Sequence, residues 1–431
     1  MGTRVHFVNR FFYPDNSATS QILSGIAFDL ARQGHDVHVT TSRQGYEDPT
    51  ALLPELEKID GVTIHRVGST NFGRVGLKGR AMDYASFALS AAKELWCIVR
   101  ADDIVVIKTD PPLLALAVAP IARLRGARFI NWMQDVFPEV VTATGLGGKI
   151  AGFALAPVKF LRNLTLLAAY QNVAIGEEMA KHLRRQGVRP DRLSVIPNWA
   201  DPETVQPVPH DVNALRQEWG LEGKFVVGYS GNLGRVHEID TIVMAIDDIY
   251  RRRKSDPVAG DIVFVFVGGG ALRAKLEREI QKRGITNVHL KPYQAKERLA
   301  ETLALADVHL VSLRAEMEGL VVPSKFYGIA AAGRPTVFIG AQNGEIANLV
   351  RRHDCGLTVN IGDGPSLARA IMQLANSNEL CRSMGRHARS AFETTFSKEF
   401  ASLNWHVLLS AAVVETRPGA PLATTTASET R

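Results

Sequence analysis

Residues 225–235 read FVVGYSGNLGR, a stretch in which a strand-like run is followed by a turn with two glycines. Its first half is a β-branched apolar run, which is typical of a strand buried on both faces of a parallel sheet. The run passes directly into a turn in which Gly231 and Gly234 let the backbone approach a ligand closely. Arg235 follows and could grip phosphate oxygens with its planar guanidinium, or it could be a solvated arginine after a tight turn.

Similar strand-like runs recur on both sides of this stretch and alternate with amphipathic, helix-like segments. Strands separated by helices predict right-handed βαβ units and parallel sheets. We therefore expect an α/β protein with two Rossmann-like, parallel-sheet domains that face a cleft. The expected strands are 5–8, 37–40, 62–67, 104–107, 128–133, 172–175 and 193–196 in the first domain, and 225–229, 262–267, 288–290, 308–312, 335–339 and 356–359 in the second.

The strand pattern pauses after residue 197, where prolines and polar residues cluster, and this predicts a linker. A Thr-, Ala- and Pro-rich composition predicts disorder at the C-terminus. The expected boundaries are 1–200 for the first domain, 201–217 for the linker, 218–395 for the second domain, 396–415 for a helix that packs back toward the first domain, and 416–431 for a disordered tail.

The composition excludes several classes of protein. The 431 residues are 46% hydrophobic and 22% charged, as in ordinary globular proteins. Three distant cysteines with no CxxC pair argue against a disulfide framework and for a reducing compartment. We expect no signal peptide and no membrane-spanning helix. The net charge of +6 suits phosphorylated substrates or an anionic bilayer, and without a known nucleic-acid-binding motif we expect no nucleic-acid partner.

Three apolar segments of the first domain, residues 82–99, 113–128 and 149–167, carry scattered Lys and Arg. Such segments can lie on an anionic bilayer surface, and the same pattern also describes ordinary packed helices with solvated basic residues. Arg123, Arg125 and Arg128 are the candidate lipid-facing charges.

The loop at residues 316–327 follows the expected strand 308–312. Its Pro-Ser-Lys segment precedes a helix, so backbone N–H groups and the ammonium of Lys325 could converge on a diphosphate. The alternative is a surface loop whose lysine contacts only solvent.

Two loops of the first domain are weaker candidates. Asn16 and Ser17 stand where the first expected helix begins and could hold an anion or simply cap the helix. Asp135 follows the strand at 128–133, where a carboxylate could orient a sugar hydroxyl or cap the next helix. With no D-x-D pair, H-E-x-x-H motif or Walker loop, we expect neither a metal nor another cofactor.

These motifs, in this order, resemble the family-four retaining glycosyltransferases, which have the GT-B fold. Residues 12–14, 32–37, 195–201, 330–335 and 355–357 extend the likeness over nearly the whole chain. Within the family, the sequence resembles bacterial enzymes of capsule, exopolysaccharide and O-antigen assembly, notably the fucosaminyltransferase type. Residues 134–139 and 323–325 carry this finer resemblance.

The resemblance implies transfer of an N-acetylhexosamine or deoxy amino sugar from a UDP-sugar, held by the second domain, to a lipid-linked saccharide, held by the first. The enzyme would be peripherally attached to the inner face of the cytoplasmic membrane. The resemblance implies that Arg235 and Lys325 neutralise the diphosphate, that Glu318 contacts the donor sugar and that Asp135 lies near the acceptor. The implied donor-binding residues are Gly231, Asn232, Arg235, Glu318, Gly319, Leu320, Ser324 and Lys325, and the implied acceptor-binding residues are Asn16, Ser17 and Asp135.

The sequence departs from the family pattern at two places. A second glutamate that commonly contacts the ribose is replaced by Phe326 or Gly328, depending on the alignment. Gln134 stands where a histidine often precedes the aspartate. A nucleotide-sugar epimerase of the same architecture, or a non-catalytic nucleotide-sugar-binding protein, are the alternative functions.

Overall fold

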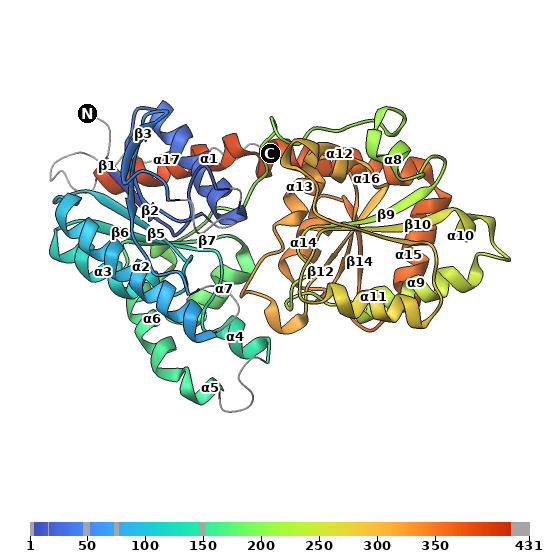
Figure 1. Cartoon of the computed structure of the whole chain (residues 1–431), viewed down its shortest axis with the longest axis horizontal. Helices are drawn as coiled ribbons and strands as arrows, with labels where there is room; N and C mark the ends of the chain where they lie inside the picture. Colours follow the sequence, from blue (N-terminus) through green and yellow to red (C-terminus); the bar gives the residue numbers. More distant parts are fainter. Residues whose placement is uncertain (1–3, 16, 46–51, 73–76, 146–150, 415–431) are drawn as a thin grey trace, which may run out of the picture. The chain divides into compact units, whose positions relative to one another are not determined.

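The computed structural model describes residues 4–15, 17–45, 52–72, 77–145 and 151–414, and contains two β-sheets (Figure 1). The predicted α/β class with two parallel-sheet domains is confirmed. The chain divides into two compact units, residues 1–130 with 402–431, and residues 131–401. The boundaries expected from the sequence stay predictions, and the tail 416–431 lies outside the described residues.

The first sheet has eight strands in the order β3-β4-β2-β1-β5-β6-β7-β8. Its central strand β1 pairs in parallel with β2 and β5, with Val5 opposite Val37 and Ile104. The edge strand β3 is antiparallel to β4 and was not predicted, because its sequence LEKI has no apolar face to bury. The strands are β1 (Arg4–Val8), β2 (Asp36–Ser42), β3 (Leu56–Ile59), β4 (Val62–Val67), β5 (Ile104–Lys108), β6 (Arg128–Met133), β7 (Gln171–Ala174) and β8 (Leu193–Val195).

Helices follow most strands of the first sheet, as the alternation in the sequence predicts. They are α1 (Ala18–Arg32), α2 (Leu77–Ile98), α3 (Leu114–Leu124), α4 (Glu139–Ala143), α5 (Ala151–Ala154), α6 (Ala156–Ala168) and α7 (Glu177–Arg185).

The second sheet is parallel, in the order β11-β10-β9-β12-β13-β14, with β9, the strand of the stretch FVVGYS, beside β10 and β12. Its register places Val227 opposite both Phe264 and Val308. The strands are β9 (Phe225–Ser230), β10 (Ile262–Val267), β11 (Val288–Lys291), β12 (Val308–Ser312), β13 (Thr336–Ile339) and β14 (Gly356–Val359).

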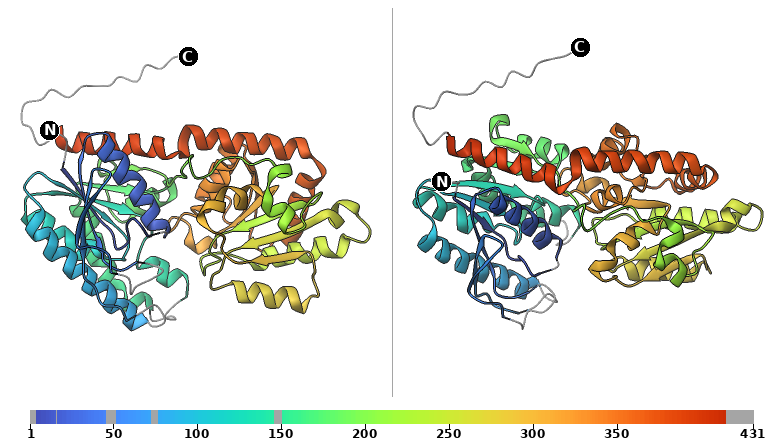
Figure 2. Two further views of the ribbon diagram at one scale, coloured as in Figure 1. Left: turned by 45° about the horizontal axis from the view of Figure 1, so that its top comes forward. Right: turned by 90° about the horizontal axis from the view of Figure 1, so that it is seen from above.

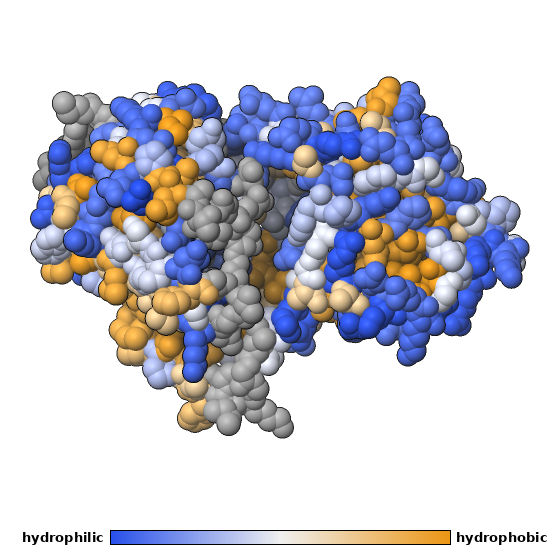
Figure 3. All heavy atoms as spheres, viewed as in Figure 1, coloured by the Kyte–Doolittle hydropathy of each residue, from blue (hydrophilic) through white to orange (hydrophobic). Residues whose placement is uncertain are grey.

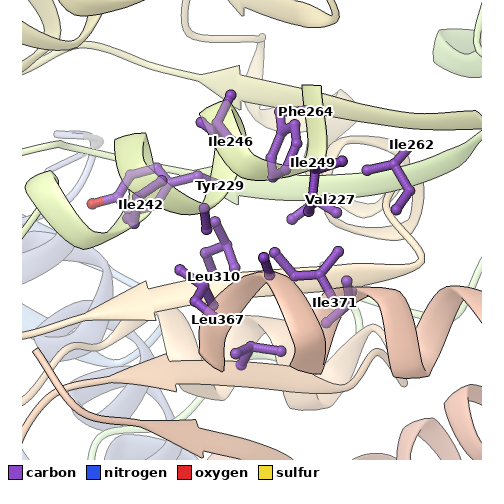
Figure 4. Close-up of a cluster of buried hydrophobic side chains, with 14 of the residues drawn as sticks. Val227, Tyr229, Ile242, Ile246, Ile249, Ile262, Phe264, Leu310, Leu367 and Ile371 are labelled. Atoms are coloured by element: carbon purple, nitrogen blue, oxygen red, sulfur yellow. The ribbon is translucent and has the colours of Figure 1, made fainter. Parts of the chain in front are cut away.

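Both faces of this second sheet are covered. On one face, Val227, Phe264 and Leu310 pack under α9 and α15 in a fully buried cluster (Figure 4). Each such side chain contributes about 1.5–3 kcal/mol to stability. The helices are α8 (Ala214–Glu218), α9 (Asp240–Arg252), α10 (Pro257–Asp261), α11 (Arg273–Lys282), α12 (Leu299–Ala304), α13 (Lys325–Ala331), α14 (Glu345–Arg352), α15 (Gly364–Asn376), α16 (Asn378–Ala391) and α17 (Lys398–Val414).

The C-terminal half of α17 lies alongside α1 (Figures 1 and 2). The Trp405 indole is fully buried and meets the Phe7 ring edge-on at 6.3 Å. The His406 and His35 rings are hydrogen-bonded at 2.9 Å. In the part of the chain that the structure describes, no helix is both long enough and apolar enough to cross a membrane.

Candidate active site

The ammonium of Lys325 is the centre of the candidate site. Lys325 begins α13, and its Nζ atom donates to the Tyr229 hydroxyl at the end of β9. Nζ also lies 3.2 Å from Nε2 of His237 and 4.0 Å from the centroid of the Tyr229 ring. The Lys325 side chain is half-buried. The carboxyl end of β9 and the loop after β12 thus meet at one cation.

His237 is a neutral acceptor for this cation. Its Nδ1 lies 2.7 Å from the backbone oxygen of Ser312, and because a carbonyl only accepts, Nδ1 carries the hydrogen. The lone pair on Nε2 is then left for the Lys325 ammonium. Burial, and the nearby charge of Lys325, lower the pKa of His237 to about 3, so the ring stays neutral at physiological pH.

Tyr229 is neutral as well. Its hydroxyl donates to the backbone oxygen of Asn232 at 3.2 Å and accepts from Lys325. Burial raises the pKa of the phenol. Within the described residues Lys325 has no ion-pair partner, and burial lowers its pKa from 10.5 to about 7. A desolvated cation with only neutral partners is suited to binding an anion, because the anion restores the stabilisation that water no longer supplies.

Glycines bring two backbone loops into contact beside this cation. Gly231 donates its N–H to the Val267 oxygen at 2.9 Å, and a β-carbon on Gly268 would lie only 2.4 Å from the Gly231 oxygen. Gly270 has a φ of +124°, and its β-carbon would lie 2.5 Å from the Leu233 oxygen. These glycines are therefore required for the close approach of the two loops.

The other predicted donor-site residues at this edge are solvent-accessible. Arg235 is exposed, and its side chain has no hydrogen-bond or ion-pair partner among the described residues. Asn232 and Ser324 are exposed too, and Ser324 is the N-cap of α13 without a side-chain cap. The structure thus brings Gly231 and Asn232 together with Lys325 and leaves Arg235 accessible at the same loop.

Glu318 caps a helix, a role that the sequence analysis did not predict. Its Oε2 accepts from the backbone N–H of Glu345 at 3.1 Å, so its carboxylate caps α14. A β-carbon on Gly344 would collide with the Glu318 carboxylate, so a larger residue there would displace this carboxylate. Burial, with the nearby carboxylates of Glu345 and Glu178, raises the pKa of Glu318 to about 7. Within the described residues no hydrogen bond joins Glu318 to Lys325, and its contact with a sugar stays a prediction.

Glu345 extends this arrangement to α7. It is buried, and its Oε2 accepts from the backbone N–H of Glu178 at 2.8 Å. A β-carbon on Gly176 would lie 2.7 Å from the Glu345 carboxyl carbon. Two carboxylates thus cap two helices in succession. The sequence motifs did not single out Glu345, although an acidic residue directly after a glycine at a helix start is an N-terminal signal.

The loop after β12 also pairs with the loop after β6. Asp135 and Val321 form an antiparallel bridge, and the N–H of Val136 donates to the Leu320 oxygen at 2.9 Å. Gly319, with a φ of +74°, lies against the start of α7, where a β-carbon would be 2.9 Å from the Glu178 oxygen. Asp135 is exposed, so its carboxylate is accessible to an acceptor.

The remaining predicted residues are less informative. Asn16 lies outside the described residues, and Ser17 is the N-cap of α1 without a side-chain cap. Gln134 accepts from the Asn198 amide at 3.1 Å. In the described parts of the chain, no group of three or more His, Cys, Asp or Glu side chains is placed to hold a metal ion.

Comparison with known families assigns both halves of the chain. Residues 211–391 match the family described as glycosyl transferases group 1, and residues 19–199 match the glycosyl transferase 4-like domain. The chain is a glycosyltransferase. Its two parallel-sheet domains are those of the GT-B fold, as the sequence resemblance implied.

Two curated relatives and one solved structure illustrate the likeness. The putative colanic acid biosynthesis glycosyl transferase WcaI of Escherichia coli K12 is 28% identical over 86% of this chain and 90% of its own length. The probable glycosyltransferase WbjE of Pseudomonas aeruginosa is 27% identical over 93% and 96%. Anabaena HepE, solved with UDP-glucose, aligns with a TM-score of 0.70 at 15% identity over 95% of this chain and 99% of its own.

The loop contact beside the site predicts a difference between two glycines. We expect Gly270→Ala to lose at least about 2 kcal/mol of unfolding free energy, because the methyl group collides with the Leu233 backbone. Gly284→Ala is the matched control, since Gly284 has a φ of +62° and open space around its β-carbon position. It should lose only about 1 kcal/mol. Urea unfolding compares the two, and equal losses would contradict the close approach.

Proposed function

We propose that this glycosyltransferase moves a sugar from a UDP-sugar to a lipid-linked saccharide in the biosynthesis of a bacterial surface polysaccharide, with retention of the anomeric configuration. The donor sugar in this proposal is an N-acetylhexosamine or a deoxy amino sugar. The reaction takes place at the inner face of the cytoplasmic membrane and needs no metal. The observation that carries the proposal is the Lys325 ammonium, whose hydrogen-bond partners among the described residues are the neutral Tyr229 and His237.

In this transfer, a cation beside the diphosphate stabilises the leaving group. As the bond between the anomeric carbon and the diphosphate oxygen breaks, negative charge develops on UDP. In the proposed role, protonated Lys325 stabilises that charge from a half-buried position, where the interaction is screened less than in water. Arg235 adds a second cation from the exposed loop.

The acceptor hydroxyl attacks the same face of the sugar in this proposal. Its oxygen forms the new bond to the anomeric carbon, and its proton passes to an oxygen of the departing diphosphate. The exposed carboxylate of Asp135 orients the acceptor, and its backbone pairing with Val321 ties it to the loop that leads to Lys325. Charge is thereby balanced without a metal.

The names of the relatives support the choice of substrates. WcaI is named for colanic acid biosynthesis, and HepE was solved with UDP-glucose. The first likeness favours a polysaccharide product, and the second favours a nucleotide-sugar donor with a uridine base. They support the proposal together with the cation site, which suits any nucleoside diphosphate.

A donor screen tests the proposed function. UDP-, GDP- and dTDP-sugars are measured for binding by calorimetry, and the binders are then assayed for transfer to polyprenyl-diphosphate-linked saccharides with and without EDTA. We expect UDP-sugars to bind preferentially and transfer to continue in EDTA. Preference for GDP- or dTDP-sugars, turnover without an acceptor, or loss of activity in EDTA that Mg²⁺ restores would each contradict the corresponding part of the proposal.

Removal of either cation should slow the transfer. We expect Lys325→Ala and Arg235→Ala each to reduce turnover by at least about tenfold, since loss of one group that stabilises developing charge commonly costs this much or more. Arg278→Ala is the control, because Arg278 is exposed on α11 in the same sheet domain. Unchanged melting temperatures establish that the fold is intact, and near-normal turnover in both variants would remove the proposed roles.

A further inference from the structure

The charged side chains of helix α6 contact one carboxylate of the protein. Between Ala151 and Ala168 the only charged residues are Lys159 and Arg162. Both contact the carboxylate of Glu139 on α4, at 3.3 Å for Lys159 and 2.5 Å for Arg162. Although burial opposes it, contact with His182 and Arg162 lowers the pKa of Glu139 to about 2, so the carboxylate stays charged. The two cations of α6 therefore share one carboxylate, which is largely buried, as is Arg162, whereas the Lys159 side chain is 40% exposed.

The outward side of the same segment is apolar. Phe153 is 90% exposed and Phe160 63% exposed, and hydrophobic atoms gather where α5 and α6 lie (Figure 3, lower left). Helices on a protein surface normally show the opposite arrangement, with polar side chains toward water. Every exposed residue from 152 to 168 is apolar, and we call this set the α5–α6 apolar face: Gly152, Phe153, Ala154, Ala156, Pro157, Phe160, Leu161, Leu164 and Leu167.

Basic residues border this apolar face. The end of helix α7 lies beside α6, because the Asn163 amide donates to Gln186 at 3.2 Å and a β-carbon on Gly187 would lie 3.4 Å from Leu167. Arg184 and Arg185, in the last turn of α7, are exposed, and within the described residues their side chains have no hydrogen-bond or ion-pair partner. An apolar stripe with a basic rim is the pattern of a helix that lies in the plane of an anionic bilayer surface.

Of the three basic residues chosen on the sequence, Arg123 is exposed and stays a candidate, whereas Arg125 and Arg128 contact other parts of the protein. Arg125 donates to the Val99 oxygen at 3.0 Å and lies over the Trp96 ring, and Arg128 donates to the Ala412 oxygen. Both are engaged in packing around α3 and are not available to lipid headgroups. A reversal of Arg128 would therefore disturb the fold rather than test membrane binding.

We propose that the α5–α6 apolar face, with Arg184 and Arg185, docks the enzyme on an anionic lipid bilayer. A bilayer fits this surface better than a protein partner because every exposed residue from 152 to 168 is apolar, while the partly exposed Lys159 and the exposed Arg184 and Arg185 are basic. At about 1.5 Å per residue, α6 is too short to span a bilayer and suits the interfacial plane. This inference rests on the proposed function, whose lipid-linked acceptor would lie in the same membrane.

Sedimentation with vesicles tests the surface. The full-length enzyme is mixed with vesicles of phosphatidylcholine alone or with added phosphatidylglycerol, at low and high salt. We expect binding to the anionic vesicles at low salt and a marked loss at high salt, because salt screens the attraction between Arg184, Arg185 and the headgroups. Equal recovery in the supernatant with both vesicle types at low salt overturns the proposal.

Matched variants separate the apolar and the basic contributions. Phe160→Ser/Leu164→Ser should weaken partitioning on the order of tenfold or more. Its control is Leu403→Ser/Val407→Ser, which removes two similarly exposed apolar side chains at the same spacing on α17. Arg184→Glu/Arg185→Glu should likewise weaken partitioning to anionic vesicles by roughly tenfold or more. Arg278→Glu/Arg382→Glu, with the same change in net charge on exposed residues, is its control.

The possible outcomes distinguish a failure of the membrane-binding proposal from a failure of the proposed function. If both test variants bind vesicles as strongly as their controls do, the proposed membrane-binding surface is contradicted, whatever the donor screen shows. If the wild type binds vesicles in the expected way but no UDP-sugar, the surface stands and the proposed function fails. If the wild type ignores vesicles and instead forms oligomers that Phe160→Ser/Leu164→Ser dissolves, the face is a protein interface and the proposal is overturned. An unchanged melting temperature for each variant establishes that it is folded.

Discussion

A half-buried ammonium whose partners in the described parts of the chain are all neutral is the constraint on which the candidate active site depends. Water stabilises a lysine cation strongly, and a protein that removes this water without supplying a carboxylate leaves the cation to be satisfied by something else. Here Lys325 meets a phenol and an uncharged imidazole, and its pKa falls to about 7. A diphosphate bound beside Nζ would supply the stabilisation that these neutral partners do not.

The surrounding backbone fixes this cation. His237 is oriented by the Ser312 oxygen at the end of β12, and Tyr229 ends β9, so two neighbouring strands set the position of Nζ. The loop that leads to Lys325 is anchored by Glu318, which caps α14, and Glu345 in turn caps α7. The side chains that hold the charge at the site thus come from strand ends and a helix start. Such preorganisation is what makes electrostatic stabilisation of a leaving group effective.

Much of this architecture follows from the sequence, because buried parallel strands read as apolar runs and their carboxyl ends carry the polar loops. The stretch at 225–235 and the Pro-Ser-Lys segment therefore located Gly231 and Lys325. The sequence could not predict which side chains contact Lys325, because nothing in the sequence distinguishes His237 and Tyr229 from other buried polar residues. Strand β3 was not predicted from the sequence, because an edge strand needs no apolar pattern. The contacts of Lys159 and Arg162 with Glu139 could not be predicted, because the periodicity of a helix indicates that it is amphipathic without saying which side faces the core.

The most direct test of the account is the ionisation of Lys325 itself. Selectively labelled lysine side chains are followed by NMR through a pH titration, and the Lys325 signal is assigned by its absence in Lys325→Met. The account predicts a pKa near 7 in the free enzyme, well below the ordinary 10.5. Binding of UDP should raise it, because the diphosphate favours the charged form, so donor affinity should fall as pH rises above about 7. A pKa near 10.5 in the free enzyme, unchanged by UDP, would contradict the account.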